Sequence, residues 1–289
     1  MSIFVNNDTR VLVQGITGRS GTFYTDMAMR YGSAYVGGVR PGKGGTTHVG
    51  LPVFHSCTDA VKETGANASL IVVPAHHAAE AMLEAIEAQI GVVVCVTERV
   101  PQHDMARVMA ALTKSDTILI GPNSQGILTP DQCKIGVMPT RDAKPGPIGI
   151  ASRSASLTSE ILAQCSQAKL GQSTTVGVGG DPIHGVGFVQ CLKAFKDDAE
   201  TEAVVLIGEI GGREEEEAAD YLASVDYGKP VVALVVGRHA PKERRMGHAG
   251  TLSFFGAETA DAKIARLRDS GVVIAADADA VVRHVLELL

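Results

Sequence analysis

Two series of short apolar segments, each alternating with amphipathic helical patterns, constrain the fold of this chain more than any other feature. Near-continuous apolar runs bounded by glycine, proline or polar residues predict buried strands of a parallel sheet that helices cover on both faces. In the first series we expect strands at residues 10–14, 34–39, 69–73, 92–96 and 117–120. In the second series we expect strands at residues 148–151, 174–178, 203–207, 231–235 and 272–275, then a closing helix at 278–289.

The two series predict two α/β domains. A chain of 289 residues is long for a single hydrophobic core, so two domains are the better expectation. The segment R-D-A-K-P-G-P at 141–147 indicates a connection, since proline and glycine interrupt regular structure. We therefore expect a first domain at residues 1–130, a linker at 131–147 and a second domain at 148–289.

Composition and charge exclude several classes of protein. A formal net charge of −6 argues against a nucleic-acid partner, which needs a basic face. No apolar run approaches the roughly 20 residues of a membrane span, and the first eight residues show no secretory leader. The five cysteines include no C-x-x-C pair. We expect a cytoplasmic protein with no membrane partner and no metal ligands of its own.

A glycine-rich turn between the first expected strand and helix predicts phosphate binding. Gly15, Gly18 and Gly21 have the spacing that lets a phosphate approach the backbone at a helix N-terminus, although a plain strand-to-helix turn is the alternative. The second strand ends without the acidic residue typical of NAD binding and supplies Arg40 and Lys43 instead. These cations favour a ligand with an extra ribose phosphate, NADP or coenzyme A, and we favour coenzyme A.

A histidine between two glycines predicts a phosphoryl carrier. The segment K-E-R-R-M-G-H-A-G at 242–250 places His248 on a basic loop whose glycines let large groups approach the ring. Such an imidazole can act as a nucleophile, although a solvated surface histidine is the alternative. The cations Lys242, Arg244 and Arg245 are expected to steady this loop or to face a partner.

Seven motifs in the same order and spacing resemble the α subunit of the succinyl-CoA synthetase family of ADP- or GDP-forming acyl-CoA ligases. Malate–CoA ligase small subunits share them. The resemblance covers the chain from about Ser2 to its end. The motifs lie at residues 15–18, 37–48, 121–123, 152–154, 178–183, 207–212 and 245–250.

The resemblance implies a fold and a reaction. The first domain is expected to be a Rossmann-like coenzyme A-binding domain, and the second a flavodoxin-like ligase domain that carries the phosphohistidine. A carboxylate, coenzyme A and a nucleoside triphosphate would give an acyl-CoA, a nucleoside diphosphate and phosphate. An ATP-grasp β subunit would bind ATP or GTP with Mg²⁺, in an αβ or α₂β₂ assembly.

The resemblance also assigns residues to these steps. His248 would carry the phosphoryl group, and Glu209 would orient its ring. Coenzyme A would contact the first domain at Thr17, Gly18, Arg19, Ser20, Lys43, Val96, Thr97 and Glu98. The phosphate and the acid would lie at the expected helix start formed by Ser154, Ala155, Ser156 and Ser159.

The last of these segments departs from the family pattern. Ala155, Ser156 and Ser159 stand where glycine, threonine and tyrosine are usual, which predicts a roomier and more polar substrate pocket. His184 and Arg99 are also unusual and are either ligand contacts or solvated surface residues. We expect a small anionic acid other than succinate, such as malate, another hydroxy- or keto-dicarboxylate, or sulfoacetate. An authentic succinyl-CoA synthetase, a non-catalytic coenzyme A-binding subunit and an NADP oxidoreductase remain the alternatives.

One acidic run has a structural interpretation. Residues 213–217, R-E-E-E-E, are expected to begin a helix, because acidic side chains suit the positive end of the helix dipole and solvent. We predict no functional role for this run.

Overall fold

The computed structural model describes residues 2–241, 246–251 and 259–289 and divides into two compact units. The amino-terminal unit comprises Phe4–Met138 with Ile183–Gly185. The carboxy-terminal unit comprises Pro139–Pro182 and Val186–Leu289 together with the first residues of the chain. The division falls within the segment expected as a linker, which also contains a strand, β9 (Cys133–Gly136), and the start of β10 (Pro145–Ser152).

The amino-terminal unit is built on a mostly parallel sheet with the strand order β3-β4-β2-β1-β5-β6-β7. Only the β3–β4 pair is antiparallel in this sheet. The strands are β1 (Arg10–Gln14), β2 (Ala34–Val39), β3 (Thr47–His48), β4 (Leu51–Phe54), β5 (Ala68–Ile71), β6 (Val92–Cys95) and β7 (Ile118–Ile120). An antiparallel hairpin of β8 (Gly126–Thr129) and β9 completes the strands of this unit. Strand order reverses between β1 and β5, and ligands of such sheets bind beyond the carboxyl ends of the strands at that point.

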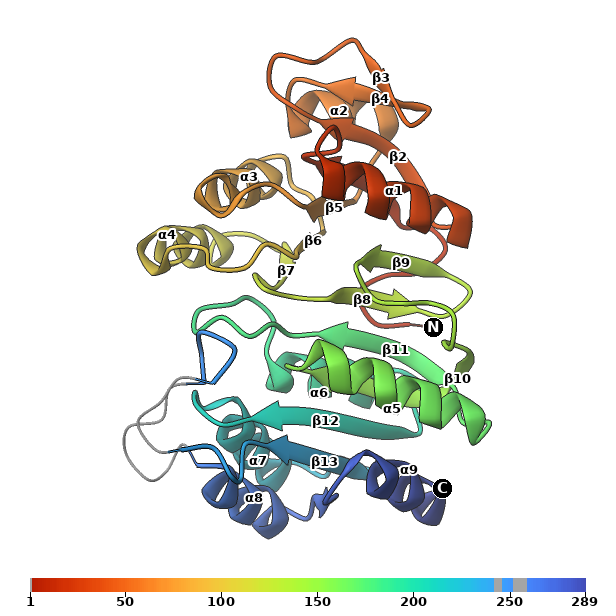
Figure 1. The fold of residues 1–289 in the computed structure, drawn as a ribbon, viewed down its shortest axis with the longest axis vertical. Coiled ribbons are helices and arrows are strands. Elements are labelled where there is room, and N and C mark those ends of the chain that lie inside the picture. The colour runs from red at the N-terminus through yellow and green to blue at the C-terminus, as the bar shows by residue number, and fades with distance from the viewer. Residues whose placement is uncertain (1, 242–245, 252–258) are drawn as a thin grey trace. The chain divides into compact units, whose positions relative to one another are not determined.

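Four helices belong to this unit, and three of them share its core. They are α1 (Arg19–Tyr31), α2 (Cys57–Thr64), α3 (Ala75–Glu87) and α4 (Gln102–Leu112). Buried side chains of α2, α3 and α4, such as Cys57, Met82 and Met105, pack with sheet residues such as Leu12 and Val93. Helices α3 and α4 lie side by side (Figure 1). Small residues dominate the buried face of α3, which lets the helix approach the sheet closely.

The carboxy-terminal unit has parallel strands in the order β14-β13-β12-β10-β11. This is the flavodoxin-like order, whose reversal lies between the first strand of the unit, β10, and β12. The remaining strands are β11 (Gln172–Gly177), β12 (Ala203–Glu209), β13 (Val231–Val236) and β14 (Val273–Ile274). The helices are α5 (Ala155–Gln167), α6 (Phe188–Asp197), α7 (Glu214–Ser224), α8 (Ala260–Asp269) and α9 (Ala278–Leu288).

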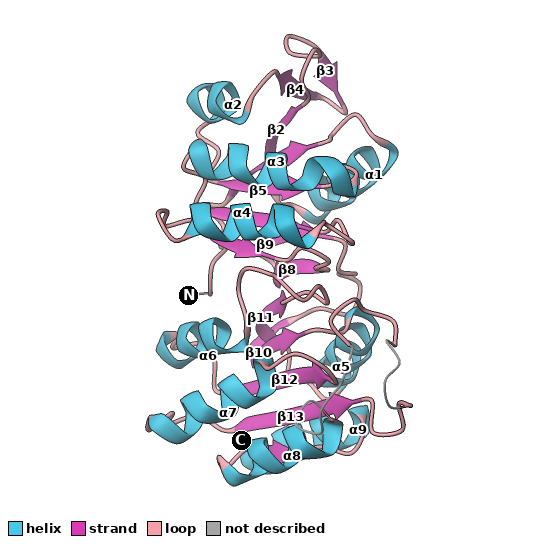
Figure 2. Cartoon of the chain, turned by 90° about the vertical axis from the view of Figure 1, so that its left-hand side faces the viewer, coloured by secondary structure: helices cyan, strands magenta, loops and turns pink. Residues whose placement is uncertain are grey.

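Helices cover both faces of the second sheet. Figure 2 shows α5 and α9 on one face and α6, α7 and α8 on the other, and the same neighbours pack together. Isoleucine and valine side chains of β10, β12 and β13 are buried against α5 and α9. The expected α/β class with two parallel-sheet domains is confirmed. The sequence analysis names no elements at α2, the short pair β3–β4 and the hairpin β8–β9.

Candidate active site

The candidate active site lies where β10 and β12 end, at the reversal of strand order in the carboxy-terminal unit. Strand β12 ends at Glu209, and β10 ends at Ser152, one residue before Arg153. Because the two strands are parallel neighbours, their carboxyl ends bring Arg153 and Glu209 together although 56 residues separate them. Sequence separation therefore hides a contact that sheet topology makes direct.

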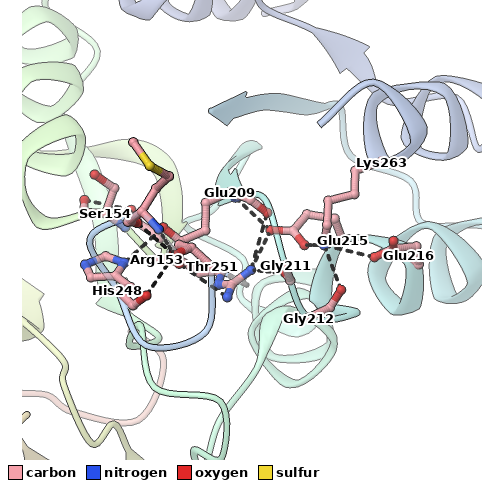
Figure 3. Close-up of polar contacts among 12 residues, drawn as sticks. Arg153, Ser154, Glu209, Gly211, Gly212, Glu215, Glu216, His248, Thr251 and Lys263 are labelled. Carbon is pink, nitrogen blue, oxygen red and sulfur yellow. Dashed lines mark hydrogen bonds and ion pairs between the residues drawn. The ribbon is translucent and has the colours of Figure 1, made fainter. Parts of the chain in front are cut away.

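His248 forms hydrogen bonds with the carboxylate of Glu209 (Figure 3). Its Nδ1 atom lies 2.9 Å from one carboxylate oxygen and 3.0 Å from the other. The Glu209 side chain is 7% exposed and the imidazole 32% exposed, so the carboxylate lies behind the ring while solvent reaches the ring in part. A carboxylate that accepts from Nδ1 leaves Nε2 as the unprotonated, nucleophilic nitrogen of the neutral ring.

The same contact changes the basicity of the ring. The hydrogen bond to Glu209 raises the pKa of His248 above its ordinary value. Partial burial and the positive charge of Arg153 oppose this rise, while the negative charges of Glu209 and Asp181 support it. The imidazole therefore lies among charges of both signs, and its basicity depends on the balance between them.

Glycines position the histidine loop against its neighbours. A Cβ at Gly180 would lie only 2.4 Å from Cγ of the His248 ring, so only glycine leaves room for the ring. The Gly250 amide donates to the Gly180 carbonyl at 3.0 Å, which ties the loop to the segment after β11. The Thr251 hydroxyl lies 2.8 Å from the His248 carbonyl oxygen and 2.7 Å from that of Met246. Residues 242–245, with the cations of the loop, lie outside the described residues.

A chain of buried charges lies behind Glu209. Arg153 is 3% exposed and contacts Glu209 at 3.3 Å and Glu215 at 3.2 Å. The other carboxylate oxygen of Glu215 contacts Lys263, which also lies 3.1 Å from Glu216. Burial alone would lower the pKa of Arg153, but Glu215 and Glu209 raise it overall. Each of these buried ions therefore has an opposite charge beside it.

This finding corrects the expectation for the acidic run at 213–217. The run does begin helix α7, but the Glu215 side chain is 1% exposed and does not face solvent. Burial alone would raise the pKa of Glu215, yet Arg153 and Lys263 hold it below the ordinary value. The sequence offered no signal for this role, because identical neighbouring glutamates differ only in which face of α7 they occupy.

The N-terminus of α5 lies next to this cluster in the chain. Ser154 is the N-cap, and its hydroxyl accepts a hydrogen bond from the Leu157 amide at 3.4 Å. Ala155 and Ser156 are exposed in the first turn, where amide groups lack partners within the helix. The Ser159 hydroxyl donates to the Ala155 carbonyl at 3.1 Å, one turn back along the helix. The helix start thus offers small polar groups and a positive dipole end.

A cavity lies beside Glu209 in the carboxy-terminal unit. It has a volume of about 390 Å³ and is bordered by Glu209, Met246 and Thr251. The rest of its wall comes from Ile210, from Val236 at the end of β13 and from residues 237–240, which include the exposed Arg238 and His239. This cavity borders Glu209, while neither His248 nor the start of α5 is part of its wall.

The glycine-rich turn of the amino-terminal unit borders a cavity of about 580 Å³. Gly15 and Gly18 line it together with residues that follow β2 and β5, at the reversal of strand order. A Cβ at Gly21 would lie 2.2 Å from the Gly15 carbonyl oxygen, so glycine is needed for the turn to close on α1. Arg40 donates to the Thr17 hydroxyl at the edge of the cavity. These features fit a phosphate-bearing ligand.

The structure brings only some of the predicted coenzyme A residues to this cavity. Thr17 and Gly18 line it, and so does Arg40, one of the two cations that favour a ligand with an extra ribose phosphate. Arg19, Ser20 and Lys43 are exposed outside its wall. Three further residues follow β6 at the same sheet edge without lining the cavity: Val96, Thr97 and Glu98.

The two unusual residues of the sequence lie in the amino-terminal unit. His184 is half-buried in the segment Ile183–Gly185, which that unit includes. Arg99 is exposed and lies 3.9 Å from Glu98, a distance at which two solvated side chains interact weakly. Neither lines the 580 Å³ cavity.

Among residues 2–241, 246–251 and 259–289, no helix is long and apolar enough to cross a membrane. In the same part of the chain, no group of three or more histidine, cysteine, aspartate or glutamate side chains is arranged to hold a metal ion.

Comparison with protein families defines the class first. Residues 6–99 match the CoA binding domain family, and residues 151–273 match the CoA-ligase family. These two matches fall in the two structural units in turn. The protein is therefore a coenzyme A-binding acid–thiol ligase with one family domain in each unit.

Comparison with curated proteins then defines the family. The α subunit of succinate–CoA ligase [ADP-forming] from Staphylococcus epidermidis is 47% identical over 272 residues, which cover 94% of this chain and 90% of the relative. The corresponding protein of Staphylococcus aureus is 48% identical over 276 residues, which cover 96% and 91%. The chain belongs to the family of succinate–CoA ligase α subunits.

A solved structure supports the fold. ATP citrate lyase of Methanosaeta concilii, solved as a mutant in complex with (3S)-citryl-CoA, matches with a TM-score of 0.89 at 23% identity. The match covers 99% of this chain and 51% of the lyase, so this chain spans about half of that protein. At this identity the likeness concerns the fold alone.

Proposed function

We propose that this chain is the α subunit of a nucleotide-dependent carboxylate–CoA ligase in which His248 carries the phosphoryl group. The observation that carries the proposal is the contact of 2.9 Å between Nδ1 of His248 and the Glu209 carboxylate. That contact fixes the tautomer in which Nε2 is the nucleophile. It also stabilises the positive charge that develops on the ring when Nε2 attacks phosphorus.

The reaction would proceed in three transfers. Nε2 of His248 attacks the terminal phosphorus of a nucleoside triphosphate, and the nucleoside diphosphate leaves. A carboxylate oxygen of the acid then attacks the same phosphorus, which gives an acyl phosphate and frees the imidazole. The thiolate of coenzyme A finally attacks the acyl carbon, and inorganic phosphate leaves as the acyl-CoA forms. Each transfer exchanges one bond for another, and Glu209 remains the acceptor for Nδ1 throughout.

The start of α5 would hold the transferred phosphate. Ser154, Ala155 and Ser156 present a helix N-terminus whose amide groups and dipole favour an anion. Arg153 precedes this turn directly, but its guanidinium contacts Glu209 and Glu215. The phosphate would therefore rely on amide and hydroxyl donors rather than on this cation.

Coenzyme A would bind the amino-terminal unit at the 580 Å³ cavity. The family match over residues 6–99 establishes coenzyme A binding, while its individual contacts are proposed here. Thr17, Gly18, Arg19 and Ser20 would meet the phosphates at the start of α1. Lys43 and Arg40 would meet the ribose phosphate, and residues 96–98 would border the rest of the ligand.

The nucleotide would come with a second subunit. Both curated relatives are named as α subunits, which supports a β partner for this chain. We propose that an ATP-grasp β subunit binds ATP or GTP and that the assembly is αβ or α₂β₂. Mg²⁺ would accompany the nucleotide in that subunit and neutralise phosphate charge.

The acid is proposed to be a small anionic carboxylic acid other than succinate. Ala155, Ser156 and Ser159 make the start of α5 small and polar, which leaves room for a hydroxyl, keto or sulfonate group. Malate and sulfoacetate are acids of this kind. Succinate itself is the second candidate, because the relatives at 47% and 48% identity are named for it.

Phosphorylation of His248 is the direct test of the proposal. The chain, assembled with its β partner, is incubated with radiolabelled ATP or GTP, and the phosphoprotein is tested for acid-labile, base-stable label. We expect label in the wild type, none in His248→Asn and slower labelling in Glu209→Gln. His284→Asn is a matched control, since Nδ1 of His284 also lies near a carboxylate, 3.1 Å from Glu287, but on the surface of α9. Label that persists in His248→Asn would refute the proposal.

A panel of acids tests the substrate. Acyl-CoA formation by the complete assembly is measured with succinate, malate, other hydroxy- and keto-dicarboxylates and sulfoacetate. The expected result is that one of the other acids has a higher kcat/KM than succinate. If succinate exceeds every other acid by about tenfold or more, a ratio worth about 1.4 kcal/mol, the second candidate replaces the first.

Binding measurements separate the remaining alternatives. Coenzyme A and NADP are titrated into the isolated chain by calorimetry. Coenzyme A binding without NADP binding is expected, and the opposite result would favour an oxidoreductase. Coenzyme A binding by an assembly that never labels His248 would indicate a non-catalytic subunit.

A further inference from the structure

The buried charges behind Glu209 carry an inference beyond the phosphoryl carrier itself. Arg153, Glu215 and Lys263 are each at most 3% exposed, and an isolated ion at such a depth costs several kcal/mol. They do not contact the His248 ring by a hydrogen bond, and family resemblance assigned them no role. Arg153 nevertheless contacts Glu209, and Glu209 in turn contacts the His248 ring.

The contacts form a continuous chain from α8 to the histidine (Figure 3). Lys263 contacts one oxygen of Glu215, and Nη1 of Arg153 lies 3.2 Å from the other. Nη2 of Arg153 then lies 3.3 Å from Oε1 of Glu209, whose carboxylate accepts from the histidine. The two ends of the guanidinium fork thus contact two different carboxylates.

Backbone groups hold the guanidinium and Glu215 in place. Nη1 of Arg153 donates to the Gly211 carbonyl at 3.0 Å, and the Glu209 amide donates to Oε1 of Glu215 at 2.9 Å. Lys263 donates to the Gly212 carbonyl at 3.1 Å. The turn that follows β12 is therefore fastened to the same charges that contact Glu209.

We propose that Arg153 is a positioning residue for His248, which holds the Glu209 carboxylate against the ring and is itself held by the buried Glu215–Lys263 pair. The proposal concerns the same site as the proposed phosphoryl transfer and rests on it for its purpose. Arg153 would set the orientation and charge of the Glu209–His248 pair, and this effect can be measured in the unphosphorylated chain.

The charges make a prediction with a definite sign. The positive charge of Arg153 opposes protonation of His248, whereas Glu209 and Asp181 favour it. Glu215 neutralises part of the Arg153 charge. A Glu215→Gln variant keeps the shape of the side chain and an oxygen that accepts from the Glu209 amide, but it removes the negative charge. The Arg153 charge then acts more strongly on Glu209 and the ring, so His248 should become a weaker base.

Imidazole NMR of the full-length chain, labelled with ¹⁵N in histidine, measures both consequences. In Glu215→Gln we expect the titration midpoint of His248 to move to lower pH while the neutral ring keeps its proton on Nδ1. In Arg153→Gln we expect the neutral ring to become a mixture of tautomers, because Glu209 is no longer held. Arg153→Lys, which keeps the charge but not the fork, should lie between Arg153→Gln and the wild type.

Surface variants of the same unit serve as controls. Asp220 and Arg266 form an exposed ion pair between α7 and α8, with side chains 51% and 58% exposed. Asp220→Asn removes one negative charge, as Glu215→Gln does, and Arg266→Gln removes one positive charge, as Arg153→Gln does. Neither control changes a residue in the chain of contacts from Lys263 to His248. Both should leave the His248 titration and its tautomer unchanged. Unfolding transitions of all variants, followed by circular dichroism, show that each is folded at the temperature of the titration.

Two results would overturn the proposal. One is a His248 titration midpoint that is the same in Glu215→Gln as in the Asp220→Asn control, or that moves to higher pH. This result is expected if Glu215 only stabilises the fold. The other is a folded Arg153→Gln chain whose neutral ring remains wholly protonated on Nδ1. If Arg153→Gln does not fold, the Glu215→Gln titration decides alone. Failure of His248 to accept phosphate would be seen in the labelling experiment and not in these titrations, so the two proposals fail separately.

Discussion

Substitution of Gly180 by alanine is the most direct test of the histidine geometry. Gly180 has no unusual backbone angle, so the change adds one methyl group and little backbone strain. That methyl carbon would lie 2.4, 2.6 and 2.8 Å from Cγ, Nδ1 and Cδ2 of His248, whereas ordinary contacts begin near 3.4 Å. The ring must therefore retreat by about 1 Å, a displacement known to cost enzymes on the order of 100-fold in rate.

The displacement would affect the hydrogen bond between Nδ1 of His248 and the Glu209 carboxylate, on which the proposed function rests. A displacement of about 1 Å would disturb the 2.9 Å contact between Nδ1 and Glu209, because a hydrogen bond tolerates only small changes in distance and angle. Loss of a hydrogen bond to a charged group costs about 1.5–3 kcal/mol of stability, and the partial exposure of the ring favours the lower end. We expect Gly180→Ala to fold with a slightly lower melting temperature and to form phosphohistidine about 100-fold more slowly.

Quench-flow labelling with radiolabelled nucleotide, in the assembly with the β partner, measures the rate. Gly91→Ala is the control, because its methyl carbon would meet only the Asn67 carbonyl oxygen at an ordinary 3.5 Å. This control should label at the wild-type rate. A Gly180→Ala chain that labels as fast as Gly91→Ala would show that the ring does not need its present position, and the geometric reasoning would be wrong.

Three further predictions concern the buried charges, the turn after β12 and coenzyme A binding. Glu215→Gln should reduce stability near neutral pH, and its difference from the wild type should shrink in acid. The pKa of Glu215 is lower in the folded chain than in the unfolded chain, so its carboxylate stabilises the fold at pH values above the unfolded-state pKa. This stabilisation is lost as the pH falls through the folded-state pKa, and urea unfolding from pH 7 to pH 3 measures the loss. Gly211→Ala should lower the free energy of unfolding by about 1–3 kcal/mol, because φ is +80° and the methyl carbon would lie 2.1 Å from the Gly250 carbonyl oxygen. Unchanged thermal unfolding would contradict it. Arg40→Gln should weaken coenzyme A binding about tenfold and reduce its salt dependence, as calorimetry at two salt concentrations would show, whereas equal affinities would place the ligand phosphate elsewhere.

Much of the fold was predictable because apolar strands leave a local pattern. The ranges 10–14 and 34–39 agree with β1 and β2 at both ends, and other expected strands differ by a few residues. The apolar segments do not indicate the order of the strands within each sheet. The flavodoxin-like order came from family resemblance, since periodicity carries no information about which strands become neighbours.

The candidate site divides in the same way. Its reacting groups follow from the sequence, because His248 between glycines is a local signal and the family resemblance assigns Glu209 to orient the ring. Arg153 lay within a quoted motif but received no role, since nothing local links it to Glu209. Glu215 was assigned to solvent, because acidic residues at a helix start usually face water. Burial of one glutamate among four depends on the position of β10 and α8, which no window of sequence contains.

The sequence by itself determined the class of fold, the phosphate-binding turn and the histidine that is proposed to carry the phosphoryl group. These depend on the period of apolar residues and on glycine spacing, which are properties of neighbouring positions. Only the tertiary structure decided that Glu209 contacts Nδ1 of His248, that Gly180 leaves room for the ring and that Arg153 joins Glu209 to Glu215. Parallel strands bring their carboxyl ends together from distant parts of the chain, and burial then makes the pairing of those charges obligatory.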